Sequence, residues 1–285
     1  MIIAVASGKG GTGKTTVATS LALSLAAELT PEPLFLDCDV EAPNAHLFLQ
    51  PAFDQRQEVS ILIPSVDEAI CTHCGKCAEV CQYHAIAVLG TKTLVFPQLC
   101  HGCGSCTALC PEWAISEIPK VIGVLERGVT PEGIPFGRGL MNIGEPMAVP
   151  IIRQLKKWAV PRPQQVVIMD APPGTSCPVV ESMRGADFVL LVTEPTPFGL
   201  HDLRLAVQVA HDLDVPVGVI INRDCSDDAR VDVFCVDADI PILMRVPFER
   251  SIAEGIARGQ TLIEIHPEYA ERLRVMFAEI VERAL

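Results

Sequence analysis

The sequence has few basic and few aromatic residues. In 285 residues, 22 Lys and Arg stand against 35 Asp and Glu, which gives a formal net charge of −13. The longest basic run is Lys156-Lys157, whereas nucleic acids and anionic membranes attract clustered Lys and Arg. Two Trp and two Tyr also leave little for stacking on bases. We therefore expect no nucleic-acid partner.

Long apolar runs and a secretory leader are also missing. No apolar run reaches the ~18 residues that a membrane helix requires, and residues 1–6 lack the basic segment that begins a secretory signal. We expect no membrane anchor and a cytoplasmic location. Thiols stay reduced in that compartment, so the twelve cysteines are expected to bind metal rather than to pair as disulfides.

Short apolar runs alternate with longer helical patterns in the rest of the chain. This alternation predicts an α/β fold with a parallel sheet. The expected strands are 2–6, 34–36, 165–169, 188–192 and 217–221, and the expected helices are 16–29, 201–213, 268–284 and one that ends at 153–159.

The first expected strand runs into a glycine-rich loop, Gly8-Lys9-Gly10-Gly11-Thr12-Gly13-Lys14-Thr15, which matches the phosphate-binding loop pattern. Glycines let backbone N–H groups turn toward a phosphate, and the following helix directs its N-terminus at it. Lys14 is expected to reach the β- and γ-phosphates and Thr15 to ligate Mg²⁺. The alternative is an ordinary glycine-rich turn between a strand and a helix.

Three aspartates follow expected strands. Asp37 and Asp39 come after the second strand, and Asp170 ends the strand at 165–169. An aspartate at this edge of a sheet is well placed to hold a Mg²⁺-bound water in a phosphoryl-transfer site. Taken singly, each also fits the cap of a helix.

The segment Lys9-Gly10-Gly11-Thr12-Gly13-Lys14-Thr15-Thr16 resembles the deviant Walker A motif of the MinD/ParA/Mrp and nitrogenase iron-protein superfamily, a SIMIBI-type group of P-loop ATPases. The resemblance implies ATP and Mg²⁺ as ligands and a dimer, with itself or with a similar subunit, that encloses ATP. It implies that Lys9 contacts the phosphates bound by the partner subunit, that Asp39 positions or activates the attacking water, and that Asp37 supports the Mg²⁺ shell. It also implies that Asp170 is the Walker B residue, that the Gly174 N–H contacts the γ-phosphate, and that Asn222 contacts adenine.

Eight of the twelve cysteines form two copies of one pattern. The first copy is Cys71, Cys74, Cys77 and Cys81, and the second is Cys100, Cys103, Cys106 and Cys110. This is the spacing of bacterial two-cluster ferredoxins, in which the fourth cysteine of each run ligates the other cluster. The predicted 4Fe–4S ligand sets are Cys71, Cys74, Cys77, Cys110 and Cys81, Cys100, Cys103, Cys106. Structural zinc on four cysteines is the competing interpretation.

The cysteine pattern interrupts the α/β signals. We predict a P-loop ATPase domain in two parts, 1–64 and 121–285, with an inserted ferredoxin-like α+β module at 65–120. Cys38, Cys177, Cys225 and Cys235 receive no assigned role. Mrp-type scaffold proteins carry a Cys-x-x-Cys soon after the position of Asn222, but here Cys225 and Cys235 are ten apart.

Three functions fit these features. The first is an ATPase whose nucleotide-driven dimerisation is coupled to electron transfer through the two clusters to a redox partner. The second is an ATPase that assembles or delivers iron–sulfur clusters or another metal cofactor to a partner protein. The third is a positioning ATPase of the MinD/ParA kind, which the acidic charge disfavours.

Overall fold

The computed structural model describes residues 1–225 and 229–284. Its centre is a sheet of nine strands in the order β11-β10-β9-β1-β8-β2-β7-β6-β3. The strands are β1 (Ile2–Ala6), β2 (Leu34–Asp37), β3 (Ala52–Val66), β6 (Ile115–Val129), β7 (Pro135–Met141), β8 (Val167–Asp170), β9 (Phe188–Thr193), β10 (Val217–Asp224) and β11 (Ile242–Pro247). From β11 to β7 neighbouring strands are parallel, whereas β6 and β3 are antiparallel additions.

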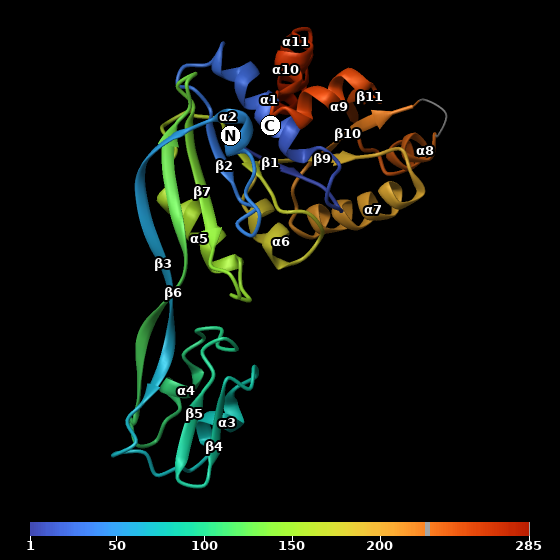
Figure 1. The fold of residues 1–285 in the computed structure, drawn as a ribbon. Coiled ribbons are helices and arrows are strands. Elements are labelled where there is room, and N and C mark those ends of the chain that lie inside the picture. Colours follow the sequence, from blue (N-terminus) through green and yellow to red (C-terminus); the bar gives the residue numbers. More distant parts are fainter. Residues whose placement is uncertain (226–228, 285) are drawn as a thin grey trace.

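Helices cover both faces of the sheet (Figure 1). One buried cluster joins the sheet to α5 (Val149–Trp158), α6 (Cys177–Met183), α7 (Pro197–Asp212) and α8 (Arg230–Asp237). The other joins it to α1 (Lys14–Ala26), α9 (Arg250–Ala257), α10 (Leu262–Ile265) and α11 (Tyr269–Ala284), while α2 (His46–Leu49) follows β2. The predicted parallel-sheet α/β fold is confirmed. No helix within the described residues is long and apolar enough to cross a membrane.

Strands β3 and β6 are much longer than their neighbours and were not predicted. Val59 pairs with Gly123, which is also the residue that pairs with Met141 at the end of β7. The second half of β3 and the first half of β6 therefore run on past the sheet as a two-stranded stalk. Since β3 runs in the same direction as β2 and β7, the stalk leaves from the carboxyl edge of the parallel strands.

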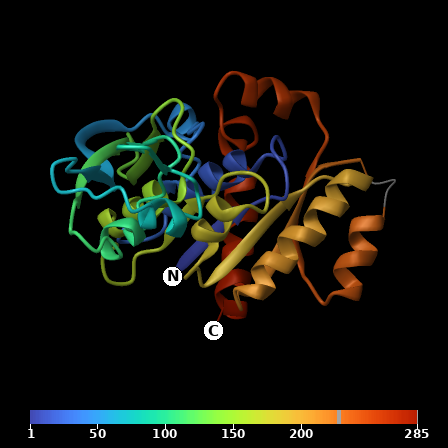
Figure 2. The ribbon, with the colours of Figure 1, turned by 90° about the horizontal axis from the view of Figure 1, so that it is seen from below.

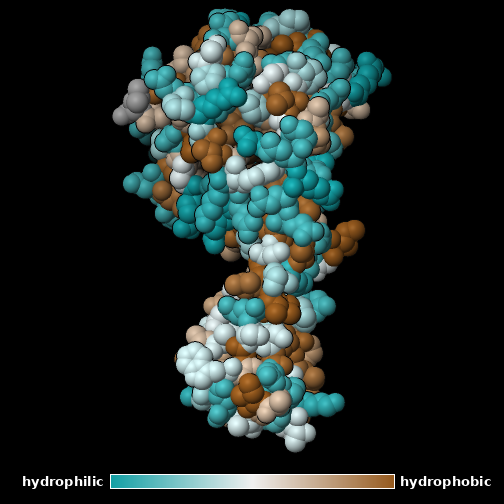
Figure 3. Space-filling view, turned by 90° about the vertical axis from the view of Figure 1, so that its left-hand side faces the viewer, coloured by the Kyte–Doolittle hydropathy of each residue, from teal (hydrophilic) through white to brown (hydrophobic). Residues whose placement is uncertain are grey.

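A small lobe, residues 67–114, sits at the end of this stalk (Figure 1). It contains α3 (Lys76–Val80), the antiparallel strands β4 (Ile86–Leu89) and β5 (Lys92–Val95), and α4 (Ser105–Ala108). Seen from below, it lies under the β3, β6 and β7 side of the sheet, away from α8 (Figure 2). A narrow neck with apolar side chains on its surface joins it to the larger part (Figure 3). The predicted module boundaries, 64/65 and 120/121, fall within β3 and β6, and this division into domains stays a prediction.

Candidate functional site

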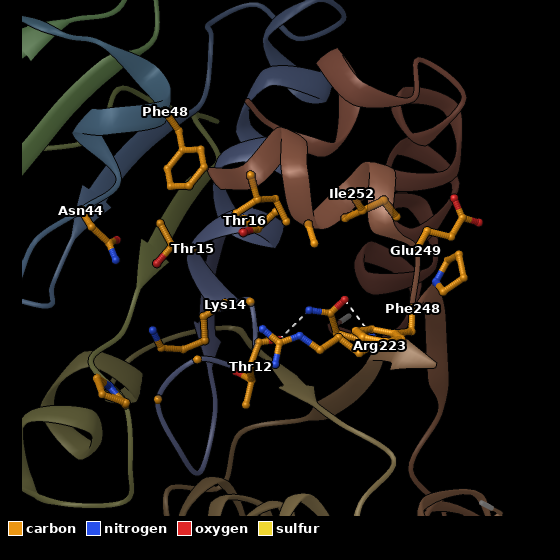
Figure 4. A pocket seen from close by; sticks show the side chains of 18 of the residues that line it. Thr12, Lys14, Thr15, Thr16, Asn44, Phe48, Arg223, Phe248, Glu249 and Ile252 are labelled. Carbon is orange, nitrogen blue, oxygen red and sulfur yellow. Dashed lines mark hydrogen bonds between the residues drawn. The ribbon is translucent and has the colours of Figure 1, made fainter. Parts of the chain in front are cut away.

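A cavity of about 390 Å³ opens beside the loop between β1 and α1. Its size is that of an ordinary small-molecule site. Of the residues predicted to bind nucleotide or act on it, Gly10, Gly11, Thr12, Gly13, Lys14, Thr15, Thr16, Asp39 and Asn222 line it. Lys14, Thr15 and Asn44 lie toward one end and Arg223, Phe248 and Glu249 toward the other (Figure 4). The glycine-rich loop thus forms the end of the cavity that suits phosphates, and the other end combines the apolar Phe248 with the charged Arg223 and Glu249.

The loop itself is held in a conformation that only small residues permit. Gly13 has φ +96° and caps α1, and an added Cβ would lie 2.3 Å from Nδ2 of Asn222. Gly8 does not line the cavity, because it packs against α7, where a Cβ would lie 2.2 Å from the Asp202 carbonyl oxygen. Both glycines therefore allow a close approach of the loop to a neighbouring element.

Asp170 ends β8 directly beneath this loop. Its Oδ2 accepts a 2.6 Å hydrogen bond from the Thr15 hydroxyl, and its Oδ1 lies 3.7 Å from Lys14 Nζ. Oδ1 is buried and has no hydrogen-bond partner in the described part of the chain. Burial raises the pKa of this carboxyl, and Lys14 opposes the shift. A hydroxyl and an unsatisfied carboxylate oxygen at one point are donors that suit Mg²⁺.

Asp37 lies next to Asp170, paired with it across β2 and β8. It is fully buried and accepts hydrogen bonds from the backbone N–H groups of Asp39 and Ala45, at 3.2 and 3.0 Å. Burial, and then the charge of Asp170, raise its pKa to about 8. Two buried carboxyls at one edge need a cation to be charged together, which again fits Mg²⁺.

The loop lysine, Lys9, is not among the residues that line the cavity. Its Nζ donates a 2.8 Å hydrogen bond to Glu194, whose other carboxylate oxygen accepts one from Arg223 at 2.5 Å. The Glu194 side chain is only 10% exposed, so its carboxylate has little contact with solvent and pairs with Lys9 and Arg223. Glu194 was missed from the sequence because it lies 185 residues from Lys9 and belongs to no motif.

Asn222 and Gly174, which are predicted to contact the nucleotide, form hydrogen bonds within the chain. Asn222 donates from Nδ2 to the Thr12 carbonyl at 2.7 Å and accepts from the Arg223 N–H at 2.9 Å. The Gly174 N–H donates to the Ser7 carbonyl at 3.0 Å. In this arrangement both residues hold the loop, and contact with adenine or a γ-phosphate stays a prediction. Phe48, Phe248 and Ile252, which give the cavity its apolar lining, were also missed, because single apolar residues carry no sequence signal.

The eight cysteines of the lobe line two separate hollows. One hollow contains Cys71, Cys74, Cys77 and Cys110, and the other contains Cys81, Cys100, Cys103 and Cys106. These are the two sets proposed from the spacing. None of the twelve cysteines, which all lie in the described residues, forms a disulfide. Among the described residues no three His, Cys, Asp or Glu side chains converge as ligands of a single metal ion.

The two halves of the lobe repeat each other in backbone conformation. Positive φ angles recur at matched positions: His73 (55°) with Gly102 (64°), Gly75 (83°) with Gly104 (74°), and His84 (52°) with Trp113 (54°). The N–H groups of His73 and Gly102 each donate to the sulfur of the first cysteine of their run at 3.4 Å. The sequence repeat therefore builds the same sulfur-binding turn twice.

Side-chain contacts connect the two parts of the molecule beyond the stalk. Lys120, on β6, donates from Nζ to Glu145 at 2.8 Å and to the Pro97 carbonyl of the lobe at 3.2 Å. Glu145 lies in the loop before α5, and Arg153 of α5 forms a bidentate pair with Glu181 of α6. Helix α6 follows the segment that contains Gly174. These contacts, together with the chain connections from Glu145 to α5 and from Gly174 to α6, link the glycine-rich loop to the lobe.

Comparison with known proteins agrees with this arrangement. The family model described as the CobQ/CobB/MinD/ParA nucleotide binding domain matches residues 3–263. This chain belongs to that family. Membership carries the P-loop, nucleotide-binding character of the cavity, while the roles assigned to individual residues stay predictions.

Relatives of this family member differ in what their names state. The Methanocaldococcus jannaschii protein MJ0579 is 30% identical, with 93% of this chain and 92% of that protein covered. A Caenorhabditis briggsae protein named as a cytosolic Fe-S cluster assembly factor, a NUBP1 homolog, is 24% identical over 99% of this chain and 79% of its own length. An iron-sulfur cluster carrier protein of Synechocystis is 25% identical over 94% of this chain and 66% of its own length.

Solved structures share the fold. The cell division ATPase MinD of Pyrococcus furiosus superposes with a TM-score of 0.57 at 20% identity, covering 100% of this chain and 99% of its own. MinD of Pyrococcus horikoshii, solved with Mg-ADP, gives the same TM-score at 20% identity and covers 98% and 95%. At this identity the likeness shows the MinD-like α/β fold of this family member and nothing finer.

Proposed function

We propose that this chain is an ATP-dependent iron–sulfur protein that assembles or delivers clusters. It binds and hydrolyses Mg·ATP in the cavity and holds iron–sulfur clusters in the lobe. The observation that carries the proposal is the grouping of eight cysteines into two hollows of four, on a stalk that leaves the sheet at the same edge as the glycine-rich loop. The names of the NUBP1 homolog and the Synechocystis carrier favour delivery over the other functions.

In the cavity, we assign ATP hydrolysis to the glycine-rich loop and three aspartates. Lys14 and the loop N–H groups hold the phosphates. Thr15, Asp37 and Asp170 are the residues that would hold Mg²⁺, which would supply positive charge to the phosphate oxygens. Asp39, which lines the cavity, orients a water toward the γ-phosphorus. The bond from that phosphorus to the bridging oxygen breaks as the new P–O bond forms, leaving ADP and phosphate.

We assign iron–sulfur clusters to the lobe because of the chemistry of its cysteine thiolates. Four thiolates per hollow are the ligand set of a 4Fe–4S cluster, and backbone N–H groups already point at two of the sulfurs. Zinc sites usually have two separated Cys-x-x-Cys pairs, whereas each run here has three close cysteines and a fourth. This spacing favours clusters over structural zinc.

A dimer that encloses ATP is part of the proposal. Lys9 is not among the residues that line the cavity of its own chain, and its Nζ is hydrogen-bonded to Glu194. We assign Lys9 to the nucleotide of a second subunit, of this or a similar chain, and expect it to leave Glu194 when that subunit binds ATP. The contacts from Gly174 through α6, α5 and Lys120 would then report closure to the lobe.

Electron transfer through the lobe is the second candidate. Each hollow already has four cysteines, a complete ligand set of the kind that retains a cluster. An electron carrier would pass electrons to a redox protein and keep its iron, whereas a delivery protein loses iron to its acceptor.

The test starts with protein purified without oxygen, in which iron and acid-labile sulfide are counted per chain. The loaded protein is then mixed with an iron-free cluster acceptor, separated from it, and analysed again. Iron that leaves the donor and appears in the acceptor as cluster supports delivery. A donor that retains all its iron while reducing an electron acceptor establishes the second candidate instead, and a donor that never holds iron removes both.

A further inference from the structure

The two cysteine hollows repeat in backbone but differ in what covers them. In the hollow of Cys81, Cys100, Cys103 and Cys106, the rings of Tyr83 and His101 stack with centroids 3.6 Å apart and planes at 6°. At the matched positions of the other hollow stand Glu112 and Thr72, which carry no ring. One hollow thus has a stacked pair of rings, whereas the other has the single ring of His73, whose Nδ1 lies 3.7 Å from Cys71 Sγ.

The hollows also differ in their place on the stalk. The covered hollow is lined by Leu62 and Pro64 of β3 and by Glu117 of β6, and a Cβ on Gly102 would lie 3.0 Å from the Leu62 carbonyl oxygen. We call it the stalk-side hollow. The lining of the other, the tip-side hollow, comes from the lobe itself and from Ile115, the first residue of β6. The stalk-side hollow therefore has β3 and β6 on one side and the stacked rings on another, while Cys103 stays exposed.

We infer that the two hollows have different tasks: the stalk-side hollow retains its cluster, and the tip-side hollow, with Cys71, Cys74, Cys77 and Cys110, is the one that exchanges clusters with an acceptor protein. This inference rests on the proposed function. Exchange requires an incoming thiol to reach iron, and a shell of packed side chains controls that access. Tyr83 and His101 act as positioning residues that keep such a thiol out of the stalk-side hollow.

The exchange is a ligand substitution. One iron–sulfur bond to a cysteine of the tip-side hollow breaks as a bond to an acceptor thiolate forms. The proton of the acceptor thiol passes to the released cysteine, and no electron changes hands. The step needs no oxidant or reductant, only access.

The test measures how fast a chelator removes iron from the intact, fully loaded protein without oxygen, with bathophenanthroline disulfonate as the probe. We expect two phases of about equal size, the slower at least about tenfold slower, because one of two clusters is shielded. In Tyr83→Ala and His101→Ala the slow phase should quicken about fivefold or more, while the fast phase keeps its rate. Trp113→Ala is the matched control: this ring is 83% exposed, stacks on no other ring in the described part of the chain, and should leave the slow phase unchanged.

Cys110→Ala identifies the exchanging hollow. It should remove the fast phase and leave the slow one, and in the transfer assay it should deliver no cluster. Three results would overturn the inference. Cys110→Ala could remove the slow phase instead of the fast one, or the wild-type protein loaded with both clusters could show a single phase. The third is a slow phase whose rate is the same in Tyr83→Ala as in the wild-type protein. These outcomes all require bound iron, so they are distinct from failure of the proposed function, in which the chain holds no iron or passes none on. Should Cys110→Ala fail to fold, the Tyr83 and His101 variants still decide.

Discussion

The nucleotide cavity and the cysteine lobe owe their order to different interactions. The cavity stands on a parallel sheet with a large buried cluster on each face. The lobe has two small clusters, and these include its own cysteines, among them Cys77 and Cys100. The cavity is therefore shaped by packing that exists without ligand, whereas the lobe is expected to need metal to complete its core.

The comparison implies that each region can be disabled without damage to the other. Lys14→Ala should lower the rate of ATP hydrolysis by about 10²–10³-fold, since it removes a charge that holds the transferring phosphoryl group. The iron content of the lobe should stay the same. Hydrolysis is measured by phosphate release, with the exposed Lys157→Ala as control. A variant that loses iron together with hydrolysis would show that the two regions fold as one.

Removal of iron should affect the regions unequally. After chelation, amide hydrogen exchange in residues 67–114 should speed up by about tenfold or more, because the lobe loses the metal that completes its core. Exchange in α1 and in β1 should change little. Equal loss of protection in the sheet and the lobe would contradict the contrast between them.

The pH dependence of the Mg²⁺-free protein should come from the cavity. Asp37 has a pKa raised from 3.8 to about 8. The folded state therefore holds a proton that the unfolded state has released, and the free energy of unfolding falls as pH rises between these values. Asp37→Asn should reduce this decrease in the free energy of unfolding. At about pH 8 it should raise the melting temperature by about 2 °C for each kcal/mol by which the free energy of unfolding increases.

Asp54→Asn is the matched control for that series, since Asp54 is exposed and is not among the groups that shift the pKa of Asp37. Mg·ADP should counter the fall in the wild-type protein, because it neutralises the carboxylate. The same slope in wild type and Asp37→Asn would rule out Asp37 as its source.

The smallest expected effect concerns the link between the regions. Lys120→Met breaks the contacts to Glu145 and Pro97 and should cost at least about 1 kcal/mol of stability, because it leaves the mostly buried Glu145 carboxylate without this partner. Its informative readout is hydrogen exchange in the lobe with Mg·ATP and with Mg·ADP. We expect the difference in lobe hydrogen exchange between Mg·ATP and Mg·ADP to become smaller in this variant. The same difference should persist in the control Lys92→Met, which changes an exposed lysine.

Local patterns made the centre of the fold and the cysteine sets predictable. The strand, loop and helix around Lys14 are coded within a few residues, and the cysteine spacing is repeated. The stalk was not predictable in this way. Most of the first half of β3 is exposed and polar, and β6 contains Pro119, Gly123 and Gly128, so neither carries the signature of a buried strand. The Lys9–Glu194 pair depends on contacts between distant segments, which no local pattern records.

The most direct test of the account is whether the nucleotide controls delivery. The loaded protein is mixed with an iron-free acceptor without oxygen, and the iron passed on is timed with Mg·ATP, with Mg·ADP and without nucleotide. We predict a transfer rate about tenfold or more higher with Mg·ATP, lost in Lys14→Ala, since only a closed ATP site would move the lobe. Equal rates in all three states, with iron fully loaded, would contradict the coupling of cavity and lobe.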